Sequence, residues 1–377
     1  MRDRQLCAVT LAAASVPALL YLPRLGWVWA TAAAAISALL LGLCGRRCAP
    51  GGLTEVIPAA FGRAGRAVLA LVLLGGALLL GGAARALCAI YPESRGGPLT
   101  GLLLLLAAAY AAERGEETVL RSGAILFFFL TAVEAVILGF SAVQVRAAWL
   151  APQTGRVPFA AMTAALSPMA VLYVRGGARR TGGWLAAGIS LCAAAALCAA
   201  GTLSPRVAGE EAFAVYTMAK SVSVFGVMER LEPVVSAALT AGGFCLLSVL
   251  CLANAKTARA LGWKKRTGIG NFLLGCAGYL AGAVLPEGVQ ALAAAICWGI
   301  VPLVTLWVAS VKKLQKNQNS PENLLQPEVI CLFPIFPFFF LSFFPALCRT
   351  SRCSFFAPAE ILSAPRIFSP DAPLLFC

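Results

Sequence analysis

Long apolar segments separated by short loops occupy most of the first 316 residues of this 377-residue chain. Overall, 60% of the residues are hydrophobic and 12% are charged, which is about half the charged fraction of a soluble globular domain. A run of about 20 apolar residues is long enough to cross the hydrocarbon core of a bilayer as a helix. The sequence therefore predicts an all-α polytopic membrane protein.

Ten of these segments are predicted to be transmembrane helices. Their approximate limits are 6–22, 27–44, 67–90, 98–112, 123–144, 158–174, 184–203, 231–253, 268–285 and 289–310. The eighth span follows a stretch, starting at Tyr216, that is predicted to be a Ser-rich loop, and Pro233 stands in its first turn, where a helix tolerates proline. We expect the other helices to pack around this eighth span.

The basic residues give the orientation of the predicted spans. With the N-terminus inside, the inner loops hold clusters such as Arg46–Arg47 and Arg179–Arg180, whereas the outer loops hold mainly scattered cations. This asymmetry is typical of cytoplasmic loops, so both ends of the ten-span core are predicted to be cytoplasmic. Nucleic-acid binding is not expected despite the net charge of +14, because the cations lie between apolar runs and not on one polar face.

Several kinds of site are disfavoured by composition. The chain has no His, so neither a His-ligated metal site nor a Ser-His-Asp triad can form. Most of the 14 Cys lie inside predicted spans, where cysteine behaves as a small hydrophobe. No nucleophile–base pair is visible, so neither an enzyme nor a cofactor or metal is expected.

Two predicted spans contain proline near their middle. Ala14, Ser15, Val16 and Pro17 interrupt the first, and Ser167, Pro168 and Met169 interrupt the sixth. Proline removes a helical hydrogen bond, and broken helices at matching positions of two halves are typical of transporter binding sites. For each proline taken singly, an ordinary kink is the simpler interpretation. The matching pair favours a ligand site.

Glu134 lies in the middle of the fifth predicted span. An isolated carboxylate at that depth costs about 2.5–3.5 kcal/mol, so we expect it to be protonated or to face a wet cavity. It is a candidate proton-titrating or ligand-contacting group. The alternative is a neutral carboxyl group hydrogen-bonded to a neighbouring helix.

A compact charged cluster, Glu229, Arg230 and Glu232, precedes the eighth span. Such a cluster is costly at the mouth of a span unless its members pair with one another. We predict a structural latch at the outer surface, and a solvated ion pair is the alternative.

The composition changes after Lys316. The segment from Ser320 to Cys377 has no Gly and is rich in Phe, Pro, Ser and Cys. The domain prediction is thus a permease-like core over residues 1–316 and a poorly ordered tail over 317–377, with a membrane-associated hairpin as the alternative for the tail.

Three stretches resemble the GerAB-type spore germination permeases. In residues 90–126 the resemblance rests on Pro98, Tyr110, Gly115, Glu117 and Arg121. At the mouth of the eighth span it rests on the Arg-Leu-Glu sequence at 230–232, and near the N-terminus on the Arg-Gln-Leu at 4–6 with the Leu-Pro at 22–23. The resemblance covers roughly residues 4–316. Ala14, Ser15 and Pro17 stand where the family usually has a glycine.

The resemblance implies a member of the amino acid–polyamine–organocation superfamily with a LeuT-like inverted repeat (5+5) and broken helices 1 and 6. It implies the B-type subunit of a nutrient germinant receptor in the spore inner membrane, working with A-type and C-type subunits. The ligand would be a small nutrient, often an amino acid, at the two breaks, with Glu134 holding a proton or the ligand's ammonium group. Arg121 and the charged cluster would have structural or gating roles.

Two other functions fit the same sequence. The protein could be a secondary transporter of amino acids, coupled to protons through Glu134. It could also be a structural family member that binds nothing, which the sparse polarity of the first break favours.

Overall fold

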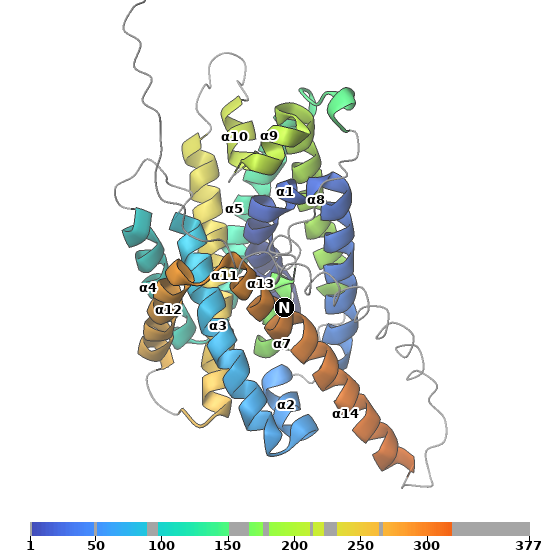
Figure 1. Ribbon diagram of the computed structural model, residues 1–377, viewed down its shortest axis with the longest axis vertical. Helices are drawn as coiled ribbons and strands as arrows, with labels where there is room; N and C mark the ends of the chain where they lie inside the picture. Colours follow the sequence, from blue (N-terminus) through green and yellow to red (C-terminus); the bar gives the residue numbers. More distant parts are fainter. Residues whose placement is uncertain are drawn as a thin grey trace, which may run out of the picture. The chain divides into compact units, whose positions relative to one another are not determined.

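The structure is a computed structural model that describes residues 2–48, 51–88, 97–150, 166–175, 181–211, 214–221, 232–263 and 267–318 (Figure 1). Every regular element in these ranges is helical. Five helical stretches are long and apolar enough to cross a membrane: α3 (Ala64–Cys88), α5 (Glu116–Ala142), most of α11 (Glu232–Ala260), α12 (Thr267–Val284) and the stretch Gly288–Lys312. The chain is therefore all-helical, as predicted, and its helices are those of an integral membrane protein.

The last of these stretches combines three elements. It covers α13 (Glu287–Ala294), the π-helical turn η3 (Ala295–Ile300) and the first part of α14 (Val301–Gln318). Two more predicted spans correspond to α4 (Gly97–Arg114) and α8 (Thr181–Leu203). By its internal contacts the chain divides after Glu322, and the predicted tail lies outside the described residues beyond Gln318.

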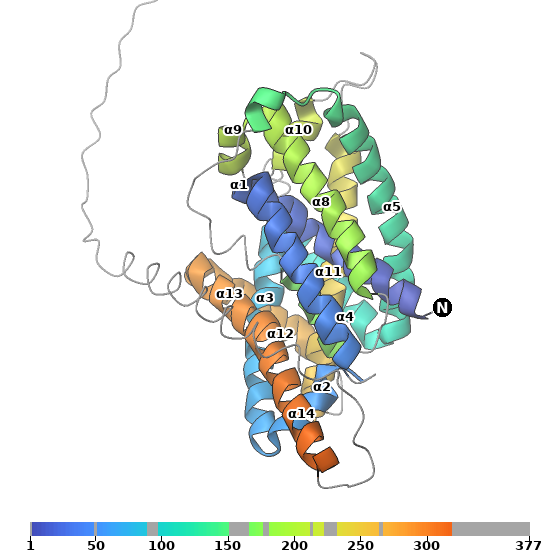
Figure 2. The same ribbon diagram turned by 90° about the vertical axis from the view of Figure 1, so that its right-hand side faces the viewer.

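The first two predicted spans form one helical element, which corrects the sequence prediction. Helix α1 runs from Arg2 to Arg47 without a break at Ala14–Pro17 or at the expected loop 23–26. It is not straight, because its N-terminal and C-terminal parts run in different directions (Figure 2). A proline removes one backbone hydrogen bond, so a helix can bend at it without unwinding.

The sixth predicted span is irregular over its described part. Ser167–Ala170 form a 3-10 turn, η2, and a single α-helical turn, α7 (Val171–Val174), follows it. Arg175 then adopts an extended conformation, with φ −158° and ψ 142°. The remainder of the prediction, residues 158–165, lies outside the described residues.

Helix α11 is the central element among the described helices. It packs against α3, α4 and α12 and also against α1 and α5, and in Figure 1 its yellow ribbon runs behind α3. Its apolar stretch is 72% buried, compared with 22% for α5. The expectation that the other helices pack around the span after Pro233 is therefore confirmed for the described residues.

Helices α3 and α12 approach closely through glycine. A Cβ atom on Gly81 would overlap the backbone of Gly278 and Tyr279, and one on Gly278 would overlap the carbonyl group of Ala77. Small residues allow helices to come this close in a membrane, where packing replaces the hydrophobic effect as the driving force. Gly81 of α3 and Gly278 of α12 therefore provide this close contact.

Four short helices occupy regions that were predicted to be loops: α2 (Leu53–Phe61), η1 (Ala147–Leu150), α9 (Pro205–Glu210) and α10 (Ala214–Ser221). Helix α10 corrects the prediction of a Ser-rich loop over residues 216–221, and the remainder of the predicted loop, residues 222–231, lies outside the described residues. The helix is stabilised by packing, since Ala214, Val215, Met218 and Ala219 are buried and it contacts α8 and α11. Tertiary contacts of this kind supply most of the stability of short helices.

Candidate functional site

Glu134 lies on the inward face of α5. Glu134 is only 8% exposed. Its neighbours at helical spacing lie on the same side of the helix; they are Leu130, Val133, Ile137 and Leu138. This face is covered by other helices although most of α5 is exposed. The local sequence thus determines which residues of α5 lie on the same face as the Glu134 carboxyl group.

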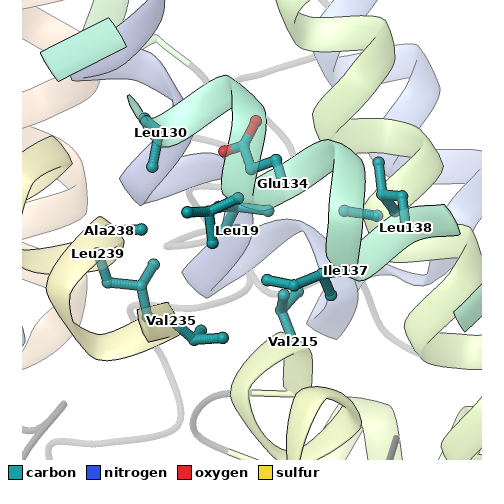
Figure 3. Close-up of a pocket in the computed structure, with 11 residues that line it drawn as sticks. Leu19, Leu130, Glu134, Ile137, Leu138, Val215, Val235, Ala238 and Leu239 are labelled. Atoms are coloured by element: carbon teal, nitrogen blue, oxygen red, sulfur yellow. The ribbon is translucent and has the colours of Figure 1, made fainter. Parts of the chain in front are cut away.

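A small cavity lies beside Glu134 where α5 meets four other helices (Figure 3). Figure 3 shows the Glu134 side chain beside Leu19 of α1 and Leu130, with Val235 and Leu239 of α11 nearby. The residues that line the cavity are Leu19, Leu130, Val133, Glu134, Ile137, Leu138, Ala195, Val215, Val235, Ala238 and Leu239. Glu134 is the one member of this set with a polar side chain.

The cavity is partly open and has a volume of about 20 Å³. That volume is enough for about one water molecule. The Oε1 atom of Glu134 is buried and has no hydrogen-bond partner among the residues that the structure describes. A buried polar atom without a partner costs about 1–3 kcal/mol, so this carboxyl group is held at the expense of stability.

The predicted break of the first span lies close to this cavity, although the backbone there is helical. Ala14, Ser15 and Val16 are buried, and the hydroxyl group of Ser15 donates to the carbonyl oxygen of Ala12 at 2.9 Å. This local hydrogen bond uses the hydroxyl proton of Ser15. The side chain of Pro17 lies outside the described residues.

Val16 connects this part of α1 to the cavity. A Cβ atom on Gly242 of α11 would contact both Val16 and Leu130. Leu130 lines the cavity, and so does Leu19, one turn beyond Val16 on α1. The structure therefore brings the neighbourhood of the predicted first break and Glu134 together.

The predicted break of the sixth span does not line the cavity. Met169 is fully buried, and the side chains of Ser167 and Pro168 lie outside the described residues. The following turn is anchored elsewhere, because the Tyr173 hydroxyl group donates to the carbonyl oxygen of Cys297 in η3 at 2.5 Å. A π-helical turn displaces backbone carbonyl groups from the usual helical pattern, which suits this acceptor.

A charged cluster at the N-terminus of α5 holds the other end of α7. We call it the Glu116 cluster, comprising Glu116, Arg175 and Lys256. The Lys256 ammonium group donates to Oε2 of Glu116 at 2.7 Å and to the carbonyl oxygen of Val174 at 2.5 Å. Arg175 donates to Oε1 of Glu116 at 3.4 Å. The three side chains are 23–28% exposed, so the cluster is half-buried and connects α5, α7 and α11.

The positions of these groups suit the helix dipoles. Glu116 lies at the N-terminus of α5, where a negative charge is favourable. Arg175 follows the last residue of α7, and Lys256 lies in the last two turns of α11, where cations are favourable. A nearby backbone also packs closely, since Gly52 has φ 84° and a Cβ atom there would lie 2.7 Å from the carbonyl oxygen of Leu172.

The predicted structural or gating residues lie apart from this cluster. Arg121 pairs with Glu117 one turn earlier on α5 at 3.4 Å, and both side chains are largely exposed, at 70% and 54%. Such a surface pair stabilises a helix by about 0.3–0.5 kcal/mol. Glu229 and Arg230 lie outside the described residues. Glu232 begins α11, but its side chain lies outside them.

Sequence reasoning missed the residues that surround Glu134 and those of the Glu116 cluster. Helical spacing from Glu134 identifies the α5 members of the cavity, but no sequence signal identifies Ala195, Val215 or Ala238 as their partners. Glu116 precedes Glu134 by 18 residues (134 − 116), or about five helical turns. That spacing places both carboxyl groups on the same face of α5 and turns Glu117 outwards.

The described residues include no group of three or more His, Cys, Asp or Glu side chains that could hold a metal ion. The fold and the cavity thus define an integral membrane protein with a buried carboxyl group in an apolar setting. No protein-family model and no curated protein sequence matches the chain, so its family is a matter for proposal.

Proposed function

We propose that the protein is the membrane subunit of a spore germinant receptor, which senses a small nutrient such as an amino acid and triggers germination. The observation that carries this proposal is the buried carboxyl group of Glu134, whose Oε1 atom has no hydrogen-bond partner among the described residues, in a cavity between α5 and four other helices. Ionisable groups at membrane depth are costly and mark ligand or ion pathways. The resemblance of residues 4–316 to GerAB-type permeases supplies the biological context, with A-type and C-type subunits as partners in the spore inner membrane.

In this proposal Glu134 receives the positively charged end of the ligand. The apolar walls from α1, α5 and α11 receive the remainder. Because the cavity has room for about one water molecule, the helices around it must separate to admit a whole amino acid. This separation is the structural change that would carry the signal to the partner subunits.

A second function, proton-coupled transport of an amino acid, is favoured by the same cavity size. A proton needs no more room than the cavity offers, and an acidic side chain within a span is typical of proton relays in transporters. In that case Glu134 binds and releases a proton while the substrate binds elsewhere between the helices.

Ligand binding to the purified full-length protein tests the proposal. Thermal unfolding is measured with each amino acid and with simple sugars, for the wild-type protein and for Glu134→Gln. We expect one nutrient to raise the unfolding midpoint of the wild-type protein and to raise it less in Glu134→Gln. The absence of any stabilisation in protein that elutes as a single species would contradict nutrient binding by this subunit.

Flux into proteoliposomes separates the two functions. A receptor binds its nutrient without net uptake. A proton-coupled transporter accumulates the nutrient when a pH gradient is imposed, and Glu134→Gln abolishes the accumulation.

A further inference from the structure

We propose that the Glu134 cavity selects an apolar monoamine, meaning one ammonium group with an alkyl tail, over a zwitterionic amino acid. This inference rests on the proposed small-molecule binding by the same site and specifies the chemistry of its ligand. Three features carry it: the charge of the cavity, the hydrogen bonds it can offer and the character of its walls.

The first feature is charge. Glu134 is the one ionisable group among the residues that line the cavity, and the structure gives its Oε1 atom no partner within the described part of the chain. An ammonium group donates a hydrogen bond to that oxygen atom and also balances the negative charge of the carboxylate, as in other charge-assisted hydrogen bonds. A zwitterion would also bring a second carboxylate next to the first, which is unfavourable at low dielectric.

The second feature is the lack of donors. None of the eleven lining residues that the structure describes has a side-chain donor for a ligand carboxylate while Glu134 is ionised. The first turns of α10 and α11 border the cavity through Val215 and Val235, and the free N–H groups of a first turn attract anions. In the sequence, Glu232 is the first residue of α11 and Glu211 stands three positions before the start of α10. An acidic residue at or near the start of a helix lowers the attraction of that end for a further anion.

The third feature is the apolar wall. Ten Leu, Ile, Val and Ala residues surround the one carboxyl group. A free ammonium ion would leave most of its N–H groups without an acceptor there, at a cost for each buried donor. An alkyl chain on the nitrogen atom replaces one of these four N–H groups with apolar surface that these walls accommodate favourably. The cavity holds the ammonium group, and the tail extends along its partly open side.

Four probes test the inference: leucine, 3-methylbutylamine, 3-methylbutanol and ammonium chloride. 3-Methylbutylamine is leucine without its carboxylate, 3-methylbutanol is the neutral equivalent of that amine, and ammonium chloride supplies the cation without the tail. Binding is measured by calorimetry and thermal unfolding on the full-length protein in a detergent without amine groups. The variants are Glu134→Gln and Glu134→Leu, with Glu117→Gln as the matched control because Glu117 is an exposed carboxylate on the same helix.

We expect the amine to bind the wild-type protein and Glu117→Gln at least about tenfold more tightly than leucine, the alcohol or ammonium, which is the effect of about 1.4 kcal/mol. Both Glu134 variants should lose this preference. Glu134→Leu keeps the site apolar, so we expect this variant to fold. Loss of amine binding by the folded Glu134→Leu protein then cannot be due to misfolding.

Three results would overturn the inference. Tighter binding of leucine than of the amine would contradict it while supporting amino acid recognition at this site. Equal binding of the amine to the wild type and to both Glu134 variants would show partition into the micelle. Binding of none of the four probes would contradict the monoamine inference, whereas the wider nutrient screen decides the proposed function separately.

Discussion

Glu116 and Glu134 lie on the same face of the same helix, yet their surroundings differ completely. Glu116 accepts hydrogen bonds from Lys256 and Arg175, whereas Glu134 is surrounded by apolar side chains and has a buried oxygen atom without a partner among the described residues. The first carboxylate is placed to stabilise the structure. The second weakens it, and residues that reduce stability are often retained for function.

The largest expected effect comes from removing the paired carboxylate. Glu116→Ala leaves Lys256 and Arg175 without their common acceptor, and we expect a loss of about 2 kcal/mol in unfolding free energy. Removing one partner of a fully buried ion pair costs about 3–5 kcal/mol. The expected loss is smaller here because the side chains of the Glu116 cluster are about a quarter exposed. Unfolding in mixed detergent micelles measures the loss. Glu117→Ala is the matched control, with an expected change below about 0.5 kcal/mol.

The opposite sign is expected at the carboxyl group of Glu134. Glu134→Leu replaces a buried polar group by an apolar one in an apolar cavity, so the unfolding free energy should rise by about 1–2 kcal/mol. Glu134→Gln should change it little, because a buried amide also needs partners. If Glu134→Leu is destabilised in the same unfolding assay, Glu134 has a partner in the folded protein and the comparison with Glu116 fails.

The smallest expected effect concerns the anchor of α7. Tyr173→Phe removes the hydrogen bond to the carbonyl oxygen of Cys297, and we expect a loss of about 1 kcal/mol. The ring stays in place, so the packing is retained. Hydrogen exchange of the amides of residues 166–175 should become faster in this variant. Unchanged exchange there would mean that the Glu116 cluster holds α7 without the help of Tyr173.

The sequence predicted some parts of this site better than others. Glu134 was identified from its depth in an apolar segment, because a carboxyl group stands out there. Glu116 was overlooked because the fifth span was predicted to begin at residue 123, whereas α5 begins at Glu116. Glu117 was named only through the family resemblance, and the sequence does not show which side of the helix is covered. The break expected at Ala14–Pro17 was wrong, since the backbone there is helical. A helix can lose the one hydrogen bond that a proline removes without unwinding.

By itself, the sequence determined that this chain is all-helical, that it has helices apolar enough to cross a membrane, roughly where these helices lie, and that one carboxyl group lies deep within a span. These properties follow from hydrophobicity and helical spacing, which are local. The sequence did not determine that α1 joins two predicted spans or that α5 begins at Glu116. Only the tertiary structure decided that Lys256 and Arg175 meet Glu116 and that apolar residues from five helices surround Glu134. Such contacts join residues far apart in the chain, and their geometry depends on how whole helices pack.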